Sequence, residues 1–117
     1  MNYQDLDCWK LSLDLVIEVY NLTSQFPANE KFNLVSQINR SAVSIPSNIA
    51  EGSARQSDKE MIQFLYVALG SAAELETQLI IAKKLGYEVN NNIYDKIIDV
   101  KKVMLGLIKY LKGKKDK

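Results

Sequence analysis

The stretch SDKEMIQFLYVALGSAAELETQLIIAKKLG, residues 57–86, decides the fold because one apolar stripe runs along its whole length. The members of this stripe recur at alternating steps of four and three residues: Met61, Leu65, Ala68, Ala72, Leu75, Leu79 and Ala82. Such spacing places side chains on one side of an α-helix. Ser57 and Glu60 have the spacing of a capping box at its start, and Gly86 supplies a glycine cap at its end. The stretch therefore predicts a long helix.

A second apolar stripe lies beside the first and consists of Ile62, Tyr66, Leu69, Ala73 and Ile80. One core-facing side of a bundle helix needs only one such stripe. We therefore expect this helix either to be the innermost one or to lie on a subunit interface as well.

Three further segments carry helical spacing. The first is expected at about residues 5–25 and ends before Pro27, with a stripe of Leu6, Trp9, Leu13, Val16 and Tyr20. The second is expected from Asn29, its N-cap, to about Gly52, with a stripe of Leu34 or Val35, Ile38, Ala42, Ile45 and Ile49. The last follows residues 90–92, with a stripe of Ile93, Ile97, Val100, Met104, Leu107 and Leu111.

No segment alternates over a useful length with the period of two that strands require. Four helices with short connections predict an all-α fold, namely an antiparallel up-down-up-down four-helix bundle. We expect one domain over residues 1–117, with a basic tail at about residues 112–117.

Residues 44–52, SIPSNIAEG, place a proline inside the second predicted helix. Pro46 cannot donate a hydrogen bond to the carbonyl of Ala42, so we expect a kink at this position. The freed backbone groups are expected to bond to the short polar side chains of Ser44, Ser47 and Asn48.

A second cluster of small residues lies in the middle of the third predicted helix: Ala68, Gly70, Ser71, Ala72 and Ala73. Glycine costs a helix about 1 kcal/mol relative to alanine, so Gly70 should have a packing reason. The two clusters predict a close approach of the second and third helices. Ion pairs across this contact are expected among Arg40, Glu51, Glu74 and Glu76.

The composition excludes several classes of site. Histidine is absent, which removes Ser-His-Asp and Cys-His nucleophile pairs and the common zinc and two-histidine iron sites. Cys8 is the single cysteine, so no internal disulfide forms, which favours a cytoplasmic protein. No run approaches about 18 apolar residues, and the acidic N-terminal residues lack the order of a signal peptide, so we expect no membrane span.

The other residues that could take part in catalysis or metal binding are interpreted as structural. Glu74 and Glu76 are two residues apart and point in different directions on a helix. Ser44 and Ser71 have no evident base. Cys8 is expected in the core, as are four aromatic residues at helical spacing, Trp9, Tyr20, Phe64 and Tyr66. We therefore expect no enzyme activity, no catalytic residue, no cofactor and no metal.

The net charge of +1 is unevenly distributed. Residues 96–117 hold eight lysines against two aspartates, which gives +6, and residues 1–95 hold seven basic against twelve acidic residues, which gives −5. A basic end on a slightly acidic body fits contact with phosphate or with an acidic partner, and it also fits a solvated lysine tail.

The chain resembles the small four-helix-bundle proteins encoded in intervening sequences of bacterial 23S rRNA genes. The resemblance is close to full length and is carried by Leu6, Trp9, Ser12, Tyr20, Phe26-Pro27, Glu30, Leu34, Ser36-Gln37-Ile38, the run RSAVSIPSNIAEG at residues 40–52 and the run ALGSAAELE at residues 68–76. It implies an up-down-up-down bundle that assembles as a barrel-like homopentamer, with no enzymatic activity.

The same resemblance implies relatives among the accessory proteins of diversity-generating retroelements, which bind a reverse transcriptase and nucleic acid through a basic surface. This chain departs from those strongly basic relatives, because it has 15 Lys+Arg against 14 Asp+Glu.

Two functions are therefore expected. The first is a non-catalytic homo-oligomeric protein that binds RNA or another nucleic acid through basic groups repeated around a ring, namely Arg40, Arg55, Lys83, Lys84, Lys101, Lys102, Lys109 and Lys112. The alternative is a protein–protein scaffold without nucleic-acid binding, which meets its partner through the second apolar stripe of the third helix.

Overall fold

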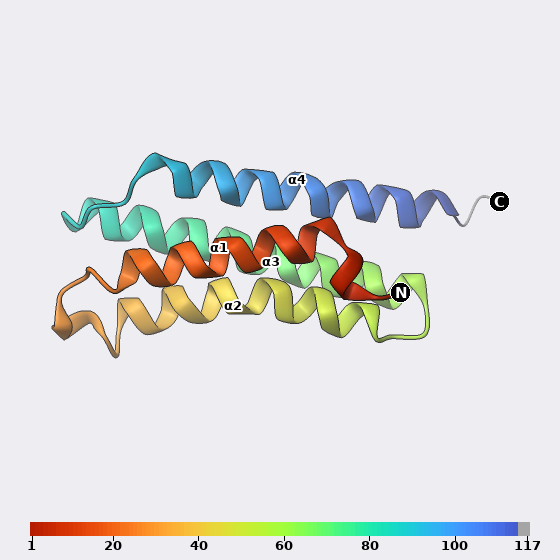
Figure 1. Cartoon of the computed structure of the whole chain (residues 1–117), viewed down its shortest axis with the longest axis horizontal. Helices are drawn as coiled ribbons and strands as arrows, with labels where there is room; N and C mark the ends of the chain where they lie inside the picture. The colour runs from red at the N-terminus through yellow and green to blue at the C-terminus, as the bar shows by residue number, and fades with distance from the viewer. Residues whose placement is uncertain (115–117) are drawn as a thin grey trace.

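Four long α-helices form the protein in the computed structural model, which describes residues 1–114 (Figure 1). The helices are α1 (Asp7–Thr23), α2 (Leu34–Ser53), α3 (Asp58–Lys84) and α4 (Asn91–Gly113), with short 3₁₀ helices η1 (Tyr3–Asp5) and η2 (Ala28–Glu30). Successive helices run in opposite directions, and both termini lie at the end that carries the α2–α3 connection (Figure 1). The predicted all-α four-helix bundle is confirmed. Of the predicted basic tail, residues 115–117 lie outside the described residues.

Each helix packs against two neighbours. Helix α2 packs against α1 and α3, and helix α4 also packs against α1 and α3, whereas the backbones of the diagonal pairs do not approach closely within the described residues. The contact between α2 and α3 is the most extensive. The bundle is therefore a square arrangement, 52 Å long and about 20 Å across, with extents of 22 and 19 Å.

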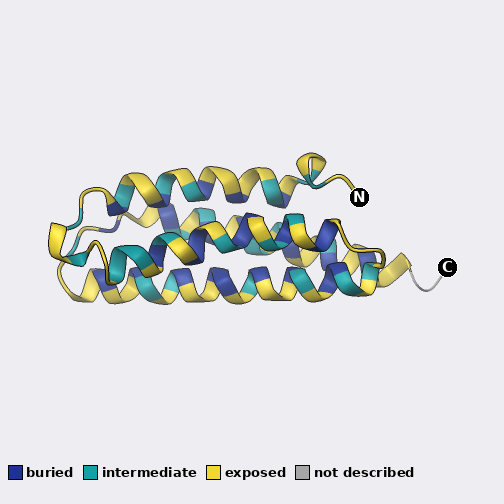
Figure 2. Ribbon diagram, turned by 90° about the horizontal axis from the view of Figure 1, so that it is seen from below, coloured by how far each residue is buried: buried dark blue, intermediate teal, exposed yellow. Residues whose placement is uncertain are grey.

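The core is built around the stripe of α3 that the sequence predicts. All seven of its residues are buried, and so are Ile38, Ala42, Ile45 and Ile49 of α2. Figure 2 shows buried residues along the inward sides of the helices and exposed residues along the outward sides. The predicted caps are confirmed too: the Ser57 hydroxyl accepts a hydrogen bond of 3.2 Å from the Glu60 amide, and Gly86 has a φ of +99°.

The predicted apolar side of the first helix is wrong. Helix α1 buries Cys8, Ser12, Leu15, Val19 and Thr23, whereas the predicted stripe is half-buried at Leu6, Trp9 and Val16 and exposed at Leu13 and Tyr20. Two polar residues tolerate burial because their hydroxyl groups are hydrogen-bonded. Ser12 donates to the Trp9 carbonyl at 2.8 Å, and Thr23 lies 2.9 Å from the Asn39 side-chain oxygen of α2 and 3.3 Å from the Tyr20 carbonyl, either of which accepts its proton.

The predicted start of the second helix is also wrong. Asn29 lies in η2, and the N-cap of α2 is Asn33, four residues further along, so that the helix begins at Leu34. The Glu30 carboxylate accepts a hydrogen bond of 2.5 Å from the Tyr87 hydroxyl, and the Phe26 and Tyr87 rings lie 5.0 Å apart. These contacts join the α1–α2 connection to the α3–α4 connection, so long-range contacts hold this segment outside the helix.

Pro46 is buried inside α2, which continues on both sides of it. The kink expected at this proline stays a prediction.

Helix α3 is long and apolar enough to cross a membrane by length and composition. The core helix of a soluble bundle passes the same test, and here a third of the most apolar part of α3 is buried inside the bundle. The absence of a membrane span therefore stays a prediction.

Gly52→Ala is expected to lower the free energy of unfolding by about 1–3 kcal/mol, because overpacking a core has this effect. A Cβ atom on Gly52 would lie 2.7 Å from Phe64 Cβ and 2.8 Å from Met61 Sδ. Denaturant unfolding followed by circular dichroism measures the change.

The matched control is Gly70→Ala. A Cβ atom on Gly70 would meet nothing within 4 Å, so helix propensity should raise stability by up to about 1 kcal/mol. Equal destabilisation by both substitutions would contradict the close approach at Gly52.

Candidate interaction surface

A small polar network joins α2 to α3 beside Pro46. The Ser44 and Ser71 hydroxyl oxygens lie 2.8 Å apart, and the Asn48 side-chain amide donates to the carbonyl and the hydroxyl of Ser44 at 2.8 and 2.9 Å. The bond expected from these side chains to the Ala42 carbonyl is not found within residues 1–114, because Asn48 bonds to Ser44 instead. The network aligns α2 with α3 and contains no base that would activate either serine.

Two of the acids expected to pair across the α2–α3 contact have other partners. Glu51 pairs with Arg55 one turn later in sequence at 2.6 Å, and Glu76 pairs with Lys101 of α4 at 3.2 Å. Arg55 is closer to Glu51 than any residue of α3 because it lies at the i+4 position. Glu76 faces α4 because its position on α3 is turned away from α2. The predicted pairing across this contact is therefore wrong.

The other two predicted ion-pair residues point outward. Arg40 and Glu74 are exposed, and neither has an ion pair within the described part of the chain. Gly70 is exposed as well and packs against nothing where a Cβ would lie. The packing reason expected for Gly70 is therefore absent within the protomer, and the close approach of α2 and α3 is made at Gly52.

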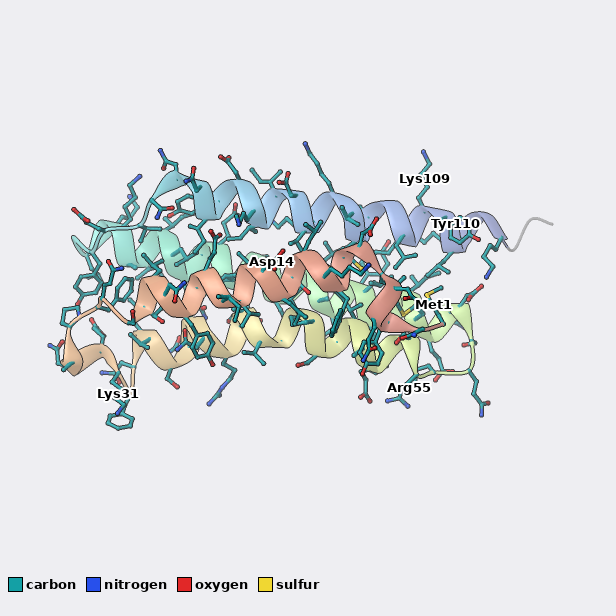
Figure 3. All side chains as sticks on the ribbon, viewed as in Figure 1. Met1, Asp14, Lys31, Arg55, Lys109 and Tyr110 are labelled. Carbon is teal, nitrogen blue, oxygen red and sulfur yellow. The ribbon has the colours of Figure 1, made fainter. Side chains whose placement is uncertain are left out.

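The eight predicted nucleic-acid-binding residues do not form one patch. Three of them are engaged: Arg55 with Glu51, Lys101 with Glu76, and Lys112 with the Tyr66 hydroxyl at 3.1 Å. The other five are exposed and lie on three different helices: Arg40 on α2, Lys83 and Lys84 at the end of α3, and Lys102 and Lys109 on α4. Figure 3 shows Lys109 pointing away from the bundle.

Apolar side chains remain exposed on the outer sides of α3 and α4. Tyr66, at 48 % exposed, and Ile80, at 44 %, belong to the second stripe of α3. The sequence analysis missed four further residues of this surface, Val67, Ile81, Ile98 and Leu105. Their signal was available, because each lies at helical spacing on the side opposite to the buried stripe.

A second apolar surface lies between α1 and α2. A groove of about 330 Å³ is lined by Tyr3, Trp9, Leu13, Val16, Val43, Pro46, Ser47 and Ala50. It exists because α1 turns its predicted stripe outward. The core position expected for the aromatic residues is therefore wrong for Tyr20 and Tyr66, which are 47 % and 48 % exposed, whereas Trp9 and Phe64 are half-buried.

The electrostatics at the α3–α4 contact centre on Glu76. Its carboxylate forms an ion pair with Lys101. The pKa of the Tyr94 hydroxyl is raised, chiefly by burial of that group and to a smaller extent by the negative charge of Glu76. The Tyr94 hydroxyl is buried without a hydrogen-bond partner among the described residues. No group of three or more cysteine and acidic side chains within residues 1–114 is arranged to hold a metal ion.

Cys8 is 1 % exposed, as the sequence predicts for a core residue. Burial raises the pKa of its thiol from 9.0 to about 11. The thiol is therefore protonated and inert near neutral pH, which is the opposite of an activated nucleophile.

These features define a four-helix bundle that leaves apolar side chains outside its core and carries unpaired lysines on its surface. The chain belongs to the family of 23S rRNA-intervening sequence proteins, whose model matches residues 4–108. No curated protein matches the chain.

A solved structure is similar to this one over nearly the whole of both chains. It is the crystal structure of a protein of unknown function from the S23 ribosomal protein family of Bacteroides thetaiotaomicron VPI-5482. The two chains are 27 % identical with a TM-score of 0.81, and the match covers 93 % of this chain and 99 % of the other. The family of this chain is thus associated with 23S rRNA intervening sequences.

The stability of the protein should fall between about pH 9 and pH 11 because of Cys8. A raised pKa means that the folded state keeps a proton that the unfolded state loses, so the contribution is complete below pH 9.0 and is lost as the pH rises through about 11. Urea unfolding at about pH 8 and about pH 10.5 should show a loss larger by up to about 2 kcal/mol in the wild type than in Cys8→Ala. Parallel pH profiles of the two proteins would contradict this assignment.

Proposed function

We propose that this protein is a non-catalytic homo-oligomeric binding protein. The observation that carries the proposal is the set of large apolar side chains left exposed on α3 and α4. Leu105 is 50 % exposed and Tyr66 is 48 % exposed, and Val67, Ile80, Ile81 and Ile98 are exposed as well. Exposed apolar side chains on the outside of a bundle fit a surface that another molecule covers. A second copy is the partner that the homopentamer implied by the family resemblance would supply.

The absence of catalysis is part of this proposal. Glu74 is exposed and Glu76 is engaged with Lys101, so the two acids do not converge on a common point. Ser44 and Ser71 bond to each other. These arrangements support structural roles for the four residues. The proposal also includes a cytoplasmic location and the absence of a cofactor or metal.

Nucleic acid is the second candidate partner. Arg40 of α2 and Lys83 and Lys84 at the end of α3 are exposed and have no ion pair within the part of the chain described here. A protomer with so few free cations binds phosphate weakly, but a ring repeats them in each copy. The alternative is a protein scaffold, in which the apolar surface meets a different protein.

Size-exclusion chromatography with light scattering and absorbance at about 260 nm tests these possibilities together. We expect a mass that is a multiple of 13.3 kDa. Titration of the assembled protein with a structured RNA should give binding that weakens steeply between low and moderate salt.

A mass of 13.3 kDa at all concentrations would contradict the homo-oligomer. An oligomer that fails to bind RNA at low salt would leave the apolar surface as the basis of function and favour the protein scaffold.

A further inference from the structure

Helix α4 presents two exposed stripes that run side by side along its outer surface. The first, which we name the lysine stripe, consists of Ile98, Lys102, Leu105 and Lys109. The second, the aspartate stripe, consists of Asp99, Val103, Gly106 and Tyr110. All of these residues are exposed except Val103, which is half-buried against the core.

The two stripes flank different neighbours of α4. Lys101 bonds to Glu76 of α3, and Lys112 bonds to Tyr66 of α3, so the lysine stripe adjoins the α3 side. Lys96 bonds to Glu18 of α1, which places the aspartate stripe on the α1 side. Figure 3 shows the neighbouring side chains Lys109 and Tyr110 leaving the helix in different directions.

We propose that the lysine stripe of one copy packs against the aspartate stripe of a second copy, with the two α4 helices parallel. The proposal rests on the homo-oligomer proposed above and names the contact that builds it. In parallel helices at the same height, Leu105 and Lys109 face the residues that follow them in sequence, Gly106 and Tyr110. Lys102 faces Val103 at that height, and its long side chain reaches Asp99, which lies about 4.5 Å back along the helix axis.

The complementarity has three parts. Lys102 meets Asp99, and each lacks an ion pair within residues 1–114. Leu105, which is 50 % exposed, meets the open side of Gly106. Lys109 meets the ring of Tyr110, which is 61 % exposed and already has the ammonium group of Lys114 at 5.9 Å from its centroid.

Neither close packing nor a positive φ requires glycine at position 106 within residues 1–114. It lies inside α4, where glycine lowers helix stability relative to alanine, and a Cβ atom there would meet nothing within 4 Å. An opening of this kind admits a large side chain from a second helix, as knobs enter holes in helix packing.

The charges favour a contact between different stripes over a contact of one stripe with itself. A parallel two-fold pairing of the lysine stripe would bring Lys102 against Lys102 and Lys109 against Lys109. A contact between unlike surfaces is heterologous, and it closes into a ring where the rotation allows. Successive residues of an α-helix are about 100° apart, so the two stripes are separated by about 100° around α4. In a ring of about four or five copies, each helix contacts its two neighbours at a similar angle.

The first test reverses the charge pair. Lys102→Asp and Asp99→Lys should each raise the dissociation constant of assembly by about tenfold or more, measured by light scattering over a dilution series. The chain carrying both substitutions should recover assembly, because 102 of one copy again meets an opposite charge at 99 of the next. Circular dichroism at each step confirms that the bundle is folded.

The second test blocks the opening. Gly106→Leu improves helix propensity and so preserves the folded protomer, but it should prevent assembly by filling the place of Leu105 from the neighbouring copy. Gln37→Leu is the matched control, since it adds a leucine to an exposed position of α2, the helix diagonally opposite α4, away from the groove between α1 and α2. Its assembly should equal that of the wild type.

The outcomes separate this contact from the proposed function. A wild-type protein that is a single protomer overturns the oligomer and the contact together. A wild-type oligomer that is unaffected by Gly106→Leu, or by the single charge reversals, overturns only the contact. Loss of RNA binding in Lys102→Asp with unchanged assembly also overturns it, because the lysine would then serve nucleic acid.

Discussion

An α-helix buries only the sides that face its neighbours, and α3 carries apolar side chains on more sides than that. Its first stripe fills the core, but Tyr66, Val67, Ile80 and Ile81 are all between 44 % and 51 % exposed. Water contact of such side chains is unfavourable by roughly 25 cal/mol per Å². The fold of one protomer cannot relieve this, because both neighbours of α3 already occupy its inner sides. Assembly or a partner is the remaining way to cover this surface.

The contact between α2 and α3 explains why the protomer is nevertheless well defined. Gly52 lets the helices approach until Phe64 and Met61 fill the place of a Cβ atom, and the Ser44–Ser71 bond aligns them further along. Small and polar residues that resemble a reactive site are thereby used in packing. The proline at position 46 is buried on the α1 side of α2, where it lines the groove between these two helices.

Local signals made part of this structure predictable. The stripe and caps of α3 depend on spacing within one helix, and they were predicted in full. The buried side of α1 was not, because Ser12 and Thr23 look polar in the sequence but have hydrogen-bond partners in the fold, Ser12 in its own helix and Thr23 at Asn39 of α2. The spacing of apolar residues does not show which polar side chains find hydrogen-bond partners in the fold.

Long-range contacts decided the other differences. The segment at Glu30 leaves the helical path because of Tyr87, a residue 57 positions away that no local pattern connects to it. The partners of Glu51 and Glu76 depended on which of several nearby cations each carboxylate reaches. The exposed surface of α4 was not predicted for a similar reason. The sequence shows which residues share one side of the helix, but not which side is left uncovered by the neighbouring helices.

The central claim is that the apolar outer surface of α4 is covered in solution by another copy. It is tested most directly by the reactivity of a single thiol with a water-soluble maleimide, in a chain carrying Cys8→Ala and Ile98→Cys, which leaves Leu105 in place. At high protein concentration this thiol should react at least about tenfold more slowly than the thiol of Cys8→Ala with Gln37→Cys, and the difference should vanish on dilution. Equal rates for the two thiols at every concentration would contradict the claim.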